Sequence, residues 1–467
     1  MKQVDVAVIG GGILGCFAAR NLRRWQLSVL MIEAEKDVCT GITRANSAVV
    51  YAGYDNKPGT LKAELTVRGN ARFGDLCREL EVPLSRCGSL MVACDPAAEQ
   101  VLEKKLRQGR ENGVPGLRLL SGQEARSMEP MLTEDVTAAL YAPTTGTVKP
   151  WQLGIAAFEN AMQNGCQVLT GTTVTAIVPQ PEGYRLQTTA GEVSCRVVVN
   201  CAGLQADRVQ ELAFPPSVRL QLDAADYLVL DRRAKKPDRV IFHQDGVCGK
   251  GITAIPCTEG NLLLSGCRRP LEEPFSTTEQ GLQNLRASAR RLLPELDETW
   301  IIRSFGAVRP NPHRMMEKEG ELVPDGRGID SFCVENPAPG FYSLIGIKTP
   351  GLTCANELGL WIGERAAQLL QAPVNETFDP HRRAMVRMRD LPPAQRAAAV
   401  AQNPDCGEVV CLCEDVTKAE ILEAIVRGAN TVDGVKRRTG CIMGRCQGGR
   451  CTQRVEELLK NYRREKQ

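Results

Sequence analysis

The chain has 467 residues, a length typical of two or three domains rather than a single core. Its 58 Lys and Arg residues against 55 Asp and Glu residues give a formal net charge of +3, which offers no basic footprint for nucleic acid. No apolar run approaches the roughly 18 residues that span a bilayer, and a strand begins where a cleavable signal would lie. We therefore expect a cytoplasmic protein, and a peripheral association with the inner membrane face through a partner remains open.

The first 33 residues follow the order strand, glycine turn, helix, strand. Gly10 permits a tight turn, Gly12 lets the backbone approach a pyrophosphate, and Gly15 lets the following helix pack against the sheet. The helix start offers free N–H groups to phosphate. Glu33 follows the second predicted strand, residues 28–32, where its carboxylate accepts hydrogen bonds from a ribose and repels a 2′-phosphate. The pattern therefore predicts an adenine dinucleotide other than NADP.

A second segment favours FAD over NAD. Residues 196–200 predict a strand, and a turn of small residues follows at 201–207. With these features, residues 1–375 resemble the D-amino-acid-oxidase-like family of FAD-dependent oxidoreductases. The resemblance implies flavin contacts from Thr43, Asn46, Ser47, Ala202, Gly203, Gly346, Gly351, Leu352 and Thr353. At Gly351 we expect a helix start that presents backbone N–H groups to the flavin edge.

The resemblance also implies the domain organisation. We expect a Rossmann-like α/β FAD-binding domain, an α+β substrate domain with a largely antiparallel sheet, and a small helical C-terminal domain. The FAD-binding parts are about 1–80, 145–215 and 320–375; the substrate domain is about 80–145 and 215–320; 376–407 is a connector and 408–467 the C-terminal domain. Within the substrate domain, residues 227–230 and 262–265 predict strands, and 249–251 and 256–261 predict hairpin connections.

Two cations near the expected flavin point to an anionic substrate. Arg309 ends an apolar segment and Lys348 lies three residues before Gly351. A pair of cations suits a phosphomonoester. Oxidation of an alcohol also needs a base, for which we name Tyr51 and His313 as candidates.

This region resembles the flavoprotein subunits of anaerobic glycerol-3-phosphate dehydrogenases, with L-2-hydroxyglutarate dehydrogenases as relatives. Tyr51 stands where relatives often have His, and residues 264–268 lack the His of the hydroxyglutarate enzymes. The second departure favours glycerol 3-phosphate. Oxidation of L-2-hydroxyglutarate or another 2-hydroxyacid, oxidation of an amino or imino acid, and electron transfer without a substrate of its own remain alternatives.

Cysteines near the C-terminus predict a metal centre. Cys411 and Cys413 form a C-x-C pair, and Cys446 and Cys451 form a C-x4-C pair. Four thiolates suit a [2Fe-2S] cluster, with structural zinc as an alternative. Cys441 forms a competing C-x4-C pair with Cys446, but the glycines around Cys446 and Cys451 favour the latter two. The 19 cysteines of the chain fit reduced thiols plus this site better than a disulfide framework.

The C-terminal region resembles the bacterioferritin-associated-ferredoxin-like [2Fe-2S] domain at 411–414, 435–439 and 444–451. A capping box at 417–420 predicts a first helix, 432–438 a second, and the region around 455–459 a last one. Because such a cluster carries one electron at a time, we expect it to drain the flavin toward a flavoprotein or iron-sulfur subunit of a hetero-oligomer. Basic residues near the cysteines offer either a docking face or a solvated surface; they are Lys436, Arg437, Arg438, Arg445 and Arg450.

Overall fold

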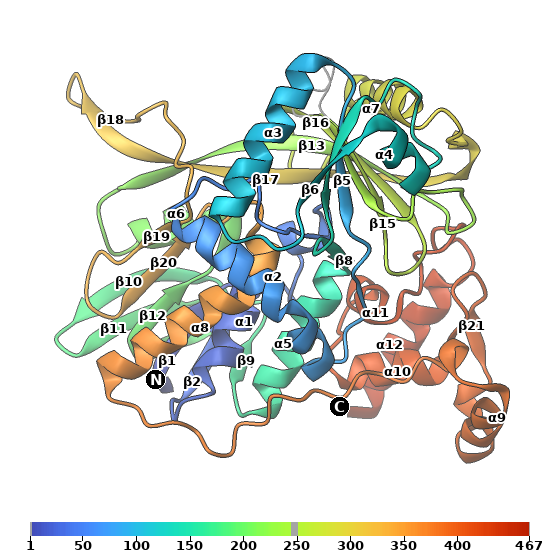
Figure 1. Cartoon of the computed structure of the whole chain (residues 1–467). Helices are drawn as coiled ribbons and strands as arrows, with labels where there is room; N and C mark the ends of the chain where they lie inside the picture. The colour runs from blue at the N-terminus through green and yellow to red at the C-terminus, as the bar shows by residue number, and fades with distance from the viewer. Residues whose placement is uncertain (1, 244–250, 467) are drawn as a thin grey trace.

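An eight-stranded sheet forms the centre of the first domain (Figure 1). The computed structural model describes residues 2–243 and 251–466. The strands of this sheet are β1 (Lys2–Ile9), β2 (Val29–Ile32), β9 (Gln167–Leu169), β10 (Val174–Gln180), β11 (Gly183–Thr188), β12 (Gly191–Asn200), β19 (Cys333–Glu335) and β20 (Phe341–Ile345). β1 pairs in parallel with β2 and with β12, as the glycine fingerprint predicts, and β10 and β11 add an antiparallel hairpin.

Helices from distant parts of the chain cover this sheet. They are α1 (Ile13–Leu22), α2 (Leu61–Glu79), α5 (Pro150–Gln163) and α8 (Gly351–Leu370). Small residues allow α1 to approach its neighbours: Ala18 and Ala19 are fully buried, and a Cβ on Gly359 of α8 would lie 2.5 Å from the Phe17 carbonyl oxygen. The apolar core between α1, α5, α8 and the sheet therefore fixes the dinucleotide turn at the carboxyl end of β1.

A nine-stranded sheet forms the second domain, above the first in Figure 1. Its strands, in spatial order, are β18 (Glu321–Pro324), β17 (Ile301–Lys318), β13 (Val218–Leu230), β16 (Leu262–Pro270), β15 (Ile252–Pro256), β14 (Val240–His243), β5 (Ser89–Ala93), β7 (Ala138–Ala142) and β6 (Arg118–Ser121). Only the β14–β5 pairing of this sheet is parallel among the described residues, which confirms the largely antiparallel expectation.

The predicted connection at 256–261 is a β15–β16 hairpin turn. The Cys257 N–H donates to the Asn261 carbonyl oxygen at 2.8 Å, and Gly260 takes a φ of +88°. The turn expected at 249–251 lies outside the described residues except for Gly251. Further elements are β3 (Val49–Val50), β4 (Leu84–Ser85), β8 (Gly146–Val148), α3 (Pro96–Glu111), α4 (Gly122–Met128), α6 (Ala206–Glu211), α7 (Glu279–Leu292), η1 (Ile42–Arg44), η2 (Gly203–Gln205) and η3 (Glu298–Trp300).

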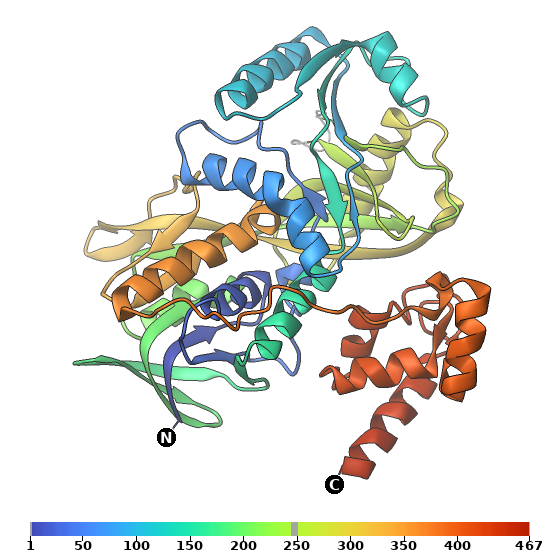
Figure 2. The same ribbon diagram turned by 60° about the horizontal axis from the view of Figure 1, so that its bottom comes forward.

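The C-terminal region forms a separate lobe, joined to α8 by a strand-free segment that runs along the first domain (Figure 2). Its elements are η4 (Met388–Asp390), α9 (Pro393–Gln402), η5 (Pro404–Cys406), β21 (Val409–Cys411), β22 (Val416–Thr417), α10 (Lys418–Val426), α11 (Val432–Thr439) and α12 (Thr452–Lys466). The predicted capping box is confirmed, because the Glu420 carboxylate accepts from the Thr417 N–H at 2.9 Å and the Thr417 hydroxyl accepts from the Glu420 N–H.

Buried ion pairs attach this lobe to the first domain. Asp37, just after β2, accepts from the Arg437 and Arg438 guanidinium groups at 2.8 Å each, and all three side chains are at most 6% exposed. Burial opposes the ionisation of Asp37, but the two arginines hold its pKa below the usual value. The expectation of a docking face or solvated surface is therefore wrong for Arg437 and Arg438, because both bind within the chain. Arg445 and Arg450 are exposed.

Within 2–243 and 251–466, no helix combines the length and the apolar character needed to cross a membrane.

Candidate functional site

The turn after β1 is shaped to receive a phosphate group. Gly10 takes a φ of +103°, and a Cβ there would lie 2.5 Å from the Cys201 carbonyl oxygen. A Cβ on Gly15 would overlap the Gly10 carbonyl oxygen, whereas at Gly12 the nearest atom, the Thr43 hydroxyl oxygen, is 3.6 Å away. Gly12 caps α1 without a side-chain hydrogen bond, and the first turn holds no acidic residue. The helix start thus keeps donors and space for an anion, which fits a dinucleotide.

Glu33 ends β2 beside this turn. Its carboxylate accepts hydrogen bonds from the Gly11 N–H at 2.5 Å and from the Glu35 N–H at 2.7 Å. Burial raises the pKa of Glu33, and these backbone donors act in the opposite direction. The side chain is held in place at the position where the fingerprint predicts a ribose contact.

The other predicted flavin contacts gather around the same edge. Ala202 and Gly203 follow β12 next to Gly10, and the Thr43 hydroxyl accepts from the Ile13 N–H at 3.0 Å. The Asn46 side chain holds its loop by donating to the Ile42 and Thr43 carbonyl oxygens, and Ser47 follows it.

The start of α8 lies across from that loop. Gly346, with a φ of +64°, packs against Pro312 of β17, and the Thr353 hydroxyl accepts from the Tyr51 N–H at 3.0 Å. The Gly351 N–H donates to the Lys348 carbonyl oxygen at 2.8 Å and the Thr353 N–H to Pro350. We expected backbone N–H groups at Gly351 to be available to the flavin edge, but both of these N–H groups are already bound within the chain. Leu352, another predicted flavin contact, lies between them.

Cationic side chains converge near this edge. Arg309 is half-buried, and its buried Nε has no acceptor among the described residues. Burial and the charge of Arg268 lower the pKa of Arg309. Burial, followed by the charges of Arg309, Lys62 and Arg268, lowers the pKa of Lys348 to about 8. Like charges held close together in a partly buried place favour the binding of an anion there.

Of the two predicted bases, Tyr51 lies close to these cations and His313 does not. The Tyr51 hydroxyl is 3.2 Å from the Ser47 hydroxyl, and burial raises the Tyr51 pKa against the effects of Ser47 and Arg309. His313 lies four residues beyond Arg309 on β17, about 13 Å along the strand. Its Nδ1 is 3.9 Å from the Asp325 carboxylate, and no hydrogen bond or ion pair joins it to Arg309, Lys348 or Tyr51 in the described chain.

Three residues at this site were not predicted: Arg268, Asn311 and Tyr227. Lys348 donates to the Asn311 side-chain oxygen at 3.2 Å, and Asn311 donates to Asp223 at 2.8 Å. Tyr227 stacks on Phe305 with ring centres 4.7 Å apart. In sequence, Asn311 had one available signal, since it lies two residues after Arg309 and so on the same face of a strand. Arg268 and Tyr227 come into place only through the pairing of β13 with β16 and β17.

The predicted metal ligands gather in the C-terminal lobe. The Sγ atoms of Cys411, Cys441 and Cys451 lie within 4.8 Å of one another and are buried. Cys413 and Cys446 interact with each other beside this group. Five thiols are thus present where four were predicted, with Cys441 as the additional one. All five of these cysteines are free thiols.

The electrostatics of this group suit a thiolate-bound centre. Hydrogen bonding from Cys441, opposed by burial, and donation from the backbone of Ile442 lower the pKa of Cys411 to about 5. Burial opposes ionisation of Cys446, but Cys413 and the backbone N–H groups of Gly448 and Arg450 lower its pKa. Soft sulfur donors with backbone N–H groups around them fit an iron-sulfur cluster.

Two family models match the chain. Residues 5–365 match the FAD dependent oxidoreductase family, and residues 409–461 match the BFD-like [2Fe-2S] binding domain. The cofactors predicted from the sequence, FAD and a [2Fe-2S] cluster, are confirmed by these matches.

Individual relatives agree with the family models. A glycerol 3-phosphate dehydrogenase of Caloramator mitchellensis is 37% identical over 463 residues, covering 97% of this chain and 93% of the relative. The anaerobic glycerol-3-phosphate dehydrogenase subunit A1 of Haloferax volcanii is 26% identical, covering 99% and 83%. The FAD-bound L-alpha-glycerophosphate oxidase of Mycoplasma pneumoniae has the same fold, with a TM-score of 0.73, 23% identity, and coverage of 83% of this chain and all of the other. This chain therefore belongs to the FAD dependent oxidoreductase family and carries a C-terminal BFD-like [2Fe-2S] binding domain.

Proposed function

We propose that this enzyme oxidises glycerol 3-phosphate to dihydroxyacetone phosphate and delivers the electrons to a partner protein. The main observation for the substrate is the group of Arg268, Arg309 and Lys348. The charge of Arg268 lowers the pKa of Arg309, and the charges of Arg309 and Arg268 lower the pKa of Lys348. A phosphomonoester dianion relieves that repulsion better than a single carboxylate. The name of the relative that matches nearly the whole chain supports the same substrate.

The chain's own residues bind and orient the substrate. When bound, FAD supplies a two-electron hydride acceptor, and the cluster supplies a one-electron carrier. Arg309 and Lys348 hold the phosphate, and Asn311 fixes the Lys348 ammonium. Oxidation of the secondary alcohol to a ketone removes a proton from the hydroxyl group and a hydride from the carbon. The chain accepts the proton, and the hydride carries the two electrons.

We propose Tyr51 and His313 as the candidates for the proton acceptor. Tyr51 is the nearer to Arg309, because each affects the other's ionisation. We expect Tyr51→Phe to lower kcat by about 10²-fold or more with little change in KM, and His313→Ala to have the smaller effect. Unchanged turnover in both variants eliminates both residues as the base.

Electrons leave, we propose, near the cysteine pair at 411 and 413 toward an electron-accepting flavoprotein or iron-sulfur subunit. Leu412, between the two predicted ligands, is 69% exposed, and Val409 is 40% exposed. Exposed apolar side chains beside a redox centre suit a transient protein contact. Such a partner would also provide any attachment to the inner membrane face.

Anaerobic bleaching of the flavin absorbance tests the substrate. Purified enzyme is mixed with glycerol 3-phosphate, L-2-hydroxyglutarate, L-lactate, proline or sarcosine, and the rate of bleaching is measured. We expect glycerol 3-phosphate to act fastest, and faster bleaching by another compound reassigns the substrate. Absence of bleaching by all five favours an electron-transfer subunit without a substrate of its own.

A further inference from the structure

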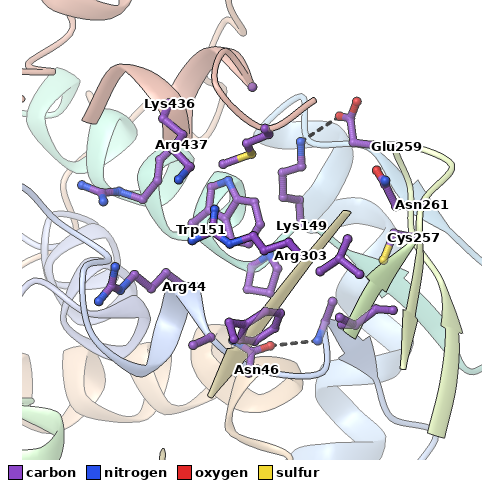
Figure 3. Close-up of a pocket in the computed structure, with 18 of the residues that line it drawn as sticks. Arg44, Asn46, Lys149, Trp151, Cys257, Glu259, Asn261, Arg303, Lys436 and Arg437 are labelled. Carbon is purple, nitrogen blue, oxygen red and sulfur yellow. Dashed lines mark hydrogen bonds and ion pairs between the residues drawn. The ribbon is translucent and has the colours of Figure 1, made fainter. Parts of the chain in front are cut away.

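A cavity of about 300 Å³ lies where the first domain, the second domain and the C-terminal lobe meet (Figure 3). We call it the junction cavity. Its wall is formed by the loop after η1, the start of α5, the β15–β16 hairpin, the start of β17, and α11 with the loop that follows. Representative lining residues are Arg44, Trp151, Asn261, Arg303, Phe305 and Lys436. Gly10, Gly12, Gly15 and Glu33 do not line it, so it is separate from the dinucleotide turn.

Positive charge in the junction cavity is not balanced by the protein. Lys149 pairs with Glu259, as the dashed line in Figure 3 shows, and Arg437 pairs with Asp37. Arg303 is exposed and has no hydrogen bond or ion pair with any described residue. Lys436, with 15% of its side chain exposed, has only Asp433 at 3.9 Å.

The charges around Lys436 repel one another. Burial and the charge of Arg303 lower the pKa of Lys436, and Arg44 and Arg437 add to this effect. The carboxylate of Glu414, which also lines the cavity, is already bound by Arg389 at 3.0 Å. An anion placed beside Lys436, with the Arg44 and Arg303 side chains near it, would relieve the repulsion that lowers the Lys436 pKa.

Aromatic walls accompany these cations. Trp151 and Arg303 lie in the middle of the cavity in Figure 3, and the buried indole N–H of Trp151 has no acceptor among the described residues. Phe305 is held by its stack on Tyr227, and Phe275 lies under the Arg44 guanidinium at 5.2 Å. Flat apolar walls with unused donors suit a planar ring that carries acceptor atoms.

We propose that the junction cavity binds a phosphorylated planar ring of the nucleoside monophosphate class. Arg303 and Lys436 bind its phosphate, and Trp151 and Phe305 contact its ring. A cavity of about 300 Å³ is at the lower end of the usual range for such ligands. The ligand would lie between Asn46, a predicted flavin contact, and Met443 and Gln447 of the cysteine loop. This binding goes beyond the proposed function and does not depend on which alcohol is oxidised.

The test uses the full-length enzyme with FAD and iron contents measured. Nucleotides released by acid are first counted against FAD, so that a ligand carried through purification is detected. Desalted enzyme is then titrated by calorimetry with flavin mononucleotide and AMP as two sources of the same chemistry, with riboflavin and adenosine as matched compounds without phosphate, and with inorganic phosphate alone.

We expect a monophosphate to bind with one site per chain and at least about ten-fold more tightly than its unphosphorylated counterpart and than phosphate. Flavin mononucleotide alone, or AMP alone, then identifies the ring. Arg303→Gln and Lys436→Gln should each weaken binding about ten-fold or more, while Arg110→Gln, an exposed arginine on α3, should not.

Three outcomes overturn the proposal. The first is that the purified enzyme carries no monophosphate and neither probe shows saturable binding. The second is that the unphosphorylated compounds, or phosphate alone, bind as tightly as the monophosphates. The third is that both cavity variants keep wild-type affinity. Unchanged FAD content and circular dichroism show that the variants are folded, and Trp151→Phe provides a second probe that keeps the ring and removes the donor.

Discussion

Lys348 lies among like charges, and this placement predicts a pH dependence. Its pKa is about 8 in the folded protein, well below the 10.5 of an ordinary lysine, because of burial and the neighbouring cations. Lys348 is therefore charged below about 8 and loses its proton as the pH rises through that value. We expect kcat/KM for an anionic substrate to fall above about 8, because the free enzyme loses one of its binding charges.

Lys348→Arg should move this alkaline limb to higher pH, because a guanidinium keeps its proton. Lys348→Met should remove the limb and raise KM. Lys318→Met, at the exposed end of β17, is the control. An alkaline limb that stays in place in Lys348→Arg would assign it to a different group.

The cysteine group makes a second prediction for single residues. Five thiols lie together, but the C-x-C pair and the glycine-flanked pair are the predicted ligands. We expect Cys441→Ala to keep iron, acid-labile sulfide and the visible absorbance of a [2Fe-2S] cluster. Cys446→Ala and Cys451→Ala should lose most of all three. Loss of the cluster in Cys441→Ala with its retention in Cys446→Ala would exchange the two assignments.

The turn between β1 and α1 gives a prediction for an element. A methyl group on Gly15 overlaps the Gly10 carbonyl oxygen, whereas a methyl group on Gly12 meets only the Thr43 hydroxyl at 3.6 Å. Gly15→Ala should therefore lower both the melting temperature of the apoprotein and its FAD content. Gly12→Ala should leave the apoprotein melting temperature almost unchanged and weaken FAD binding, because only the bound pyrophosphate needs that space. Equal FAD affinity in Gly12→Ala and wild type would contradict the predicted approach of the phosphate.

Elements were predicted best where the pattern is local. The sequence predicted the strand before Gly10, the capping box at Thr417 and the start of α8 at Gly351, because capping and hydrophobic periodicity act within a few residues. It did not predict that α11 packs against the loop after β2. In the sequence, the arginines of α11 look like a solvated basic surface. Only the folded chain brings Asp37 to them, and Asp37 is 400 residues away from Arg437.

The Asp37 contact gives a prediction for the whole molecule. Asp37→Asn leaves two buried arginines without their counter-charge, which should cost about 3–5 kcal/mol of the free energy that holds the lobe in place. We expect faster trypsin cleavage in the 376–407 segment and slower electron delivery to an external one-electron acceptor, with unchanged bleaching of the flavin by substrate. Asp75→Asn, which breaks an exposed pair with Arg78, is the control.

The same contact has a defined pH dependence. Because the folded-state pKa of Asp37 is depressed, its contribution is present at neutral pH and is lost as the pH falls through that depressed value. In acid, the wild-type enzyme should therefore be cleaved in the 376–407 segment as fast as Asp37→Asn, whereas at neutral pH it should be cleaved more slowly. An acid-active protease measures the cleavage at low pH. Equal protection of both proteins at neutral pH would show that other contacts hold the lobe.

The sequence by itself determined the cofactor classes and the order of the domains, because a glycine turn and closely spaced cysteines express their chemistry within short stretches of chain. The tertiary structure decided which cations share a site. Strand pairing between β13, β16 and β17 brings Arg268 and Arg309 together, and the loop before α8 brings Lys348 to Asn311. The junction cavity exists only because distant segments pack together. Charges far apart in the chain affect one another only after folding has brought them close, since Coulomb interactions depend on distance and burial rather than on sequence separation.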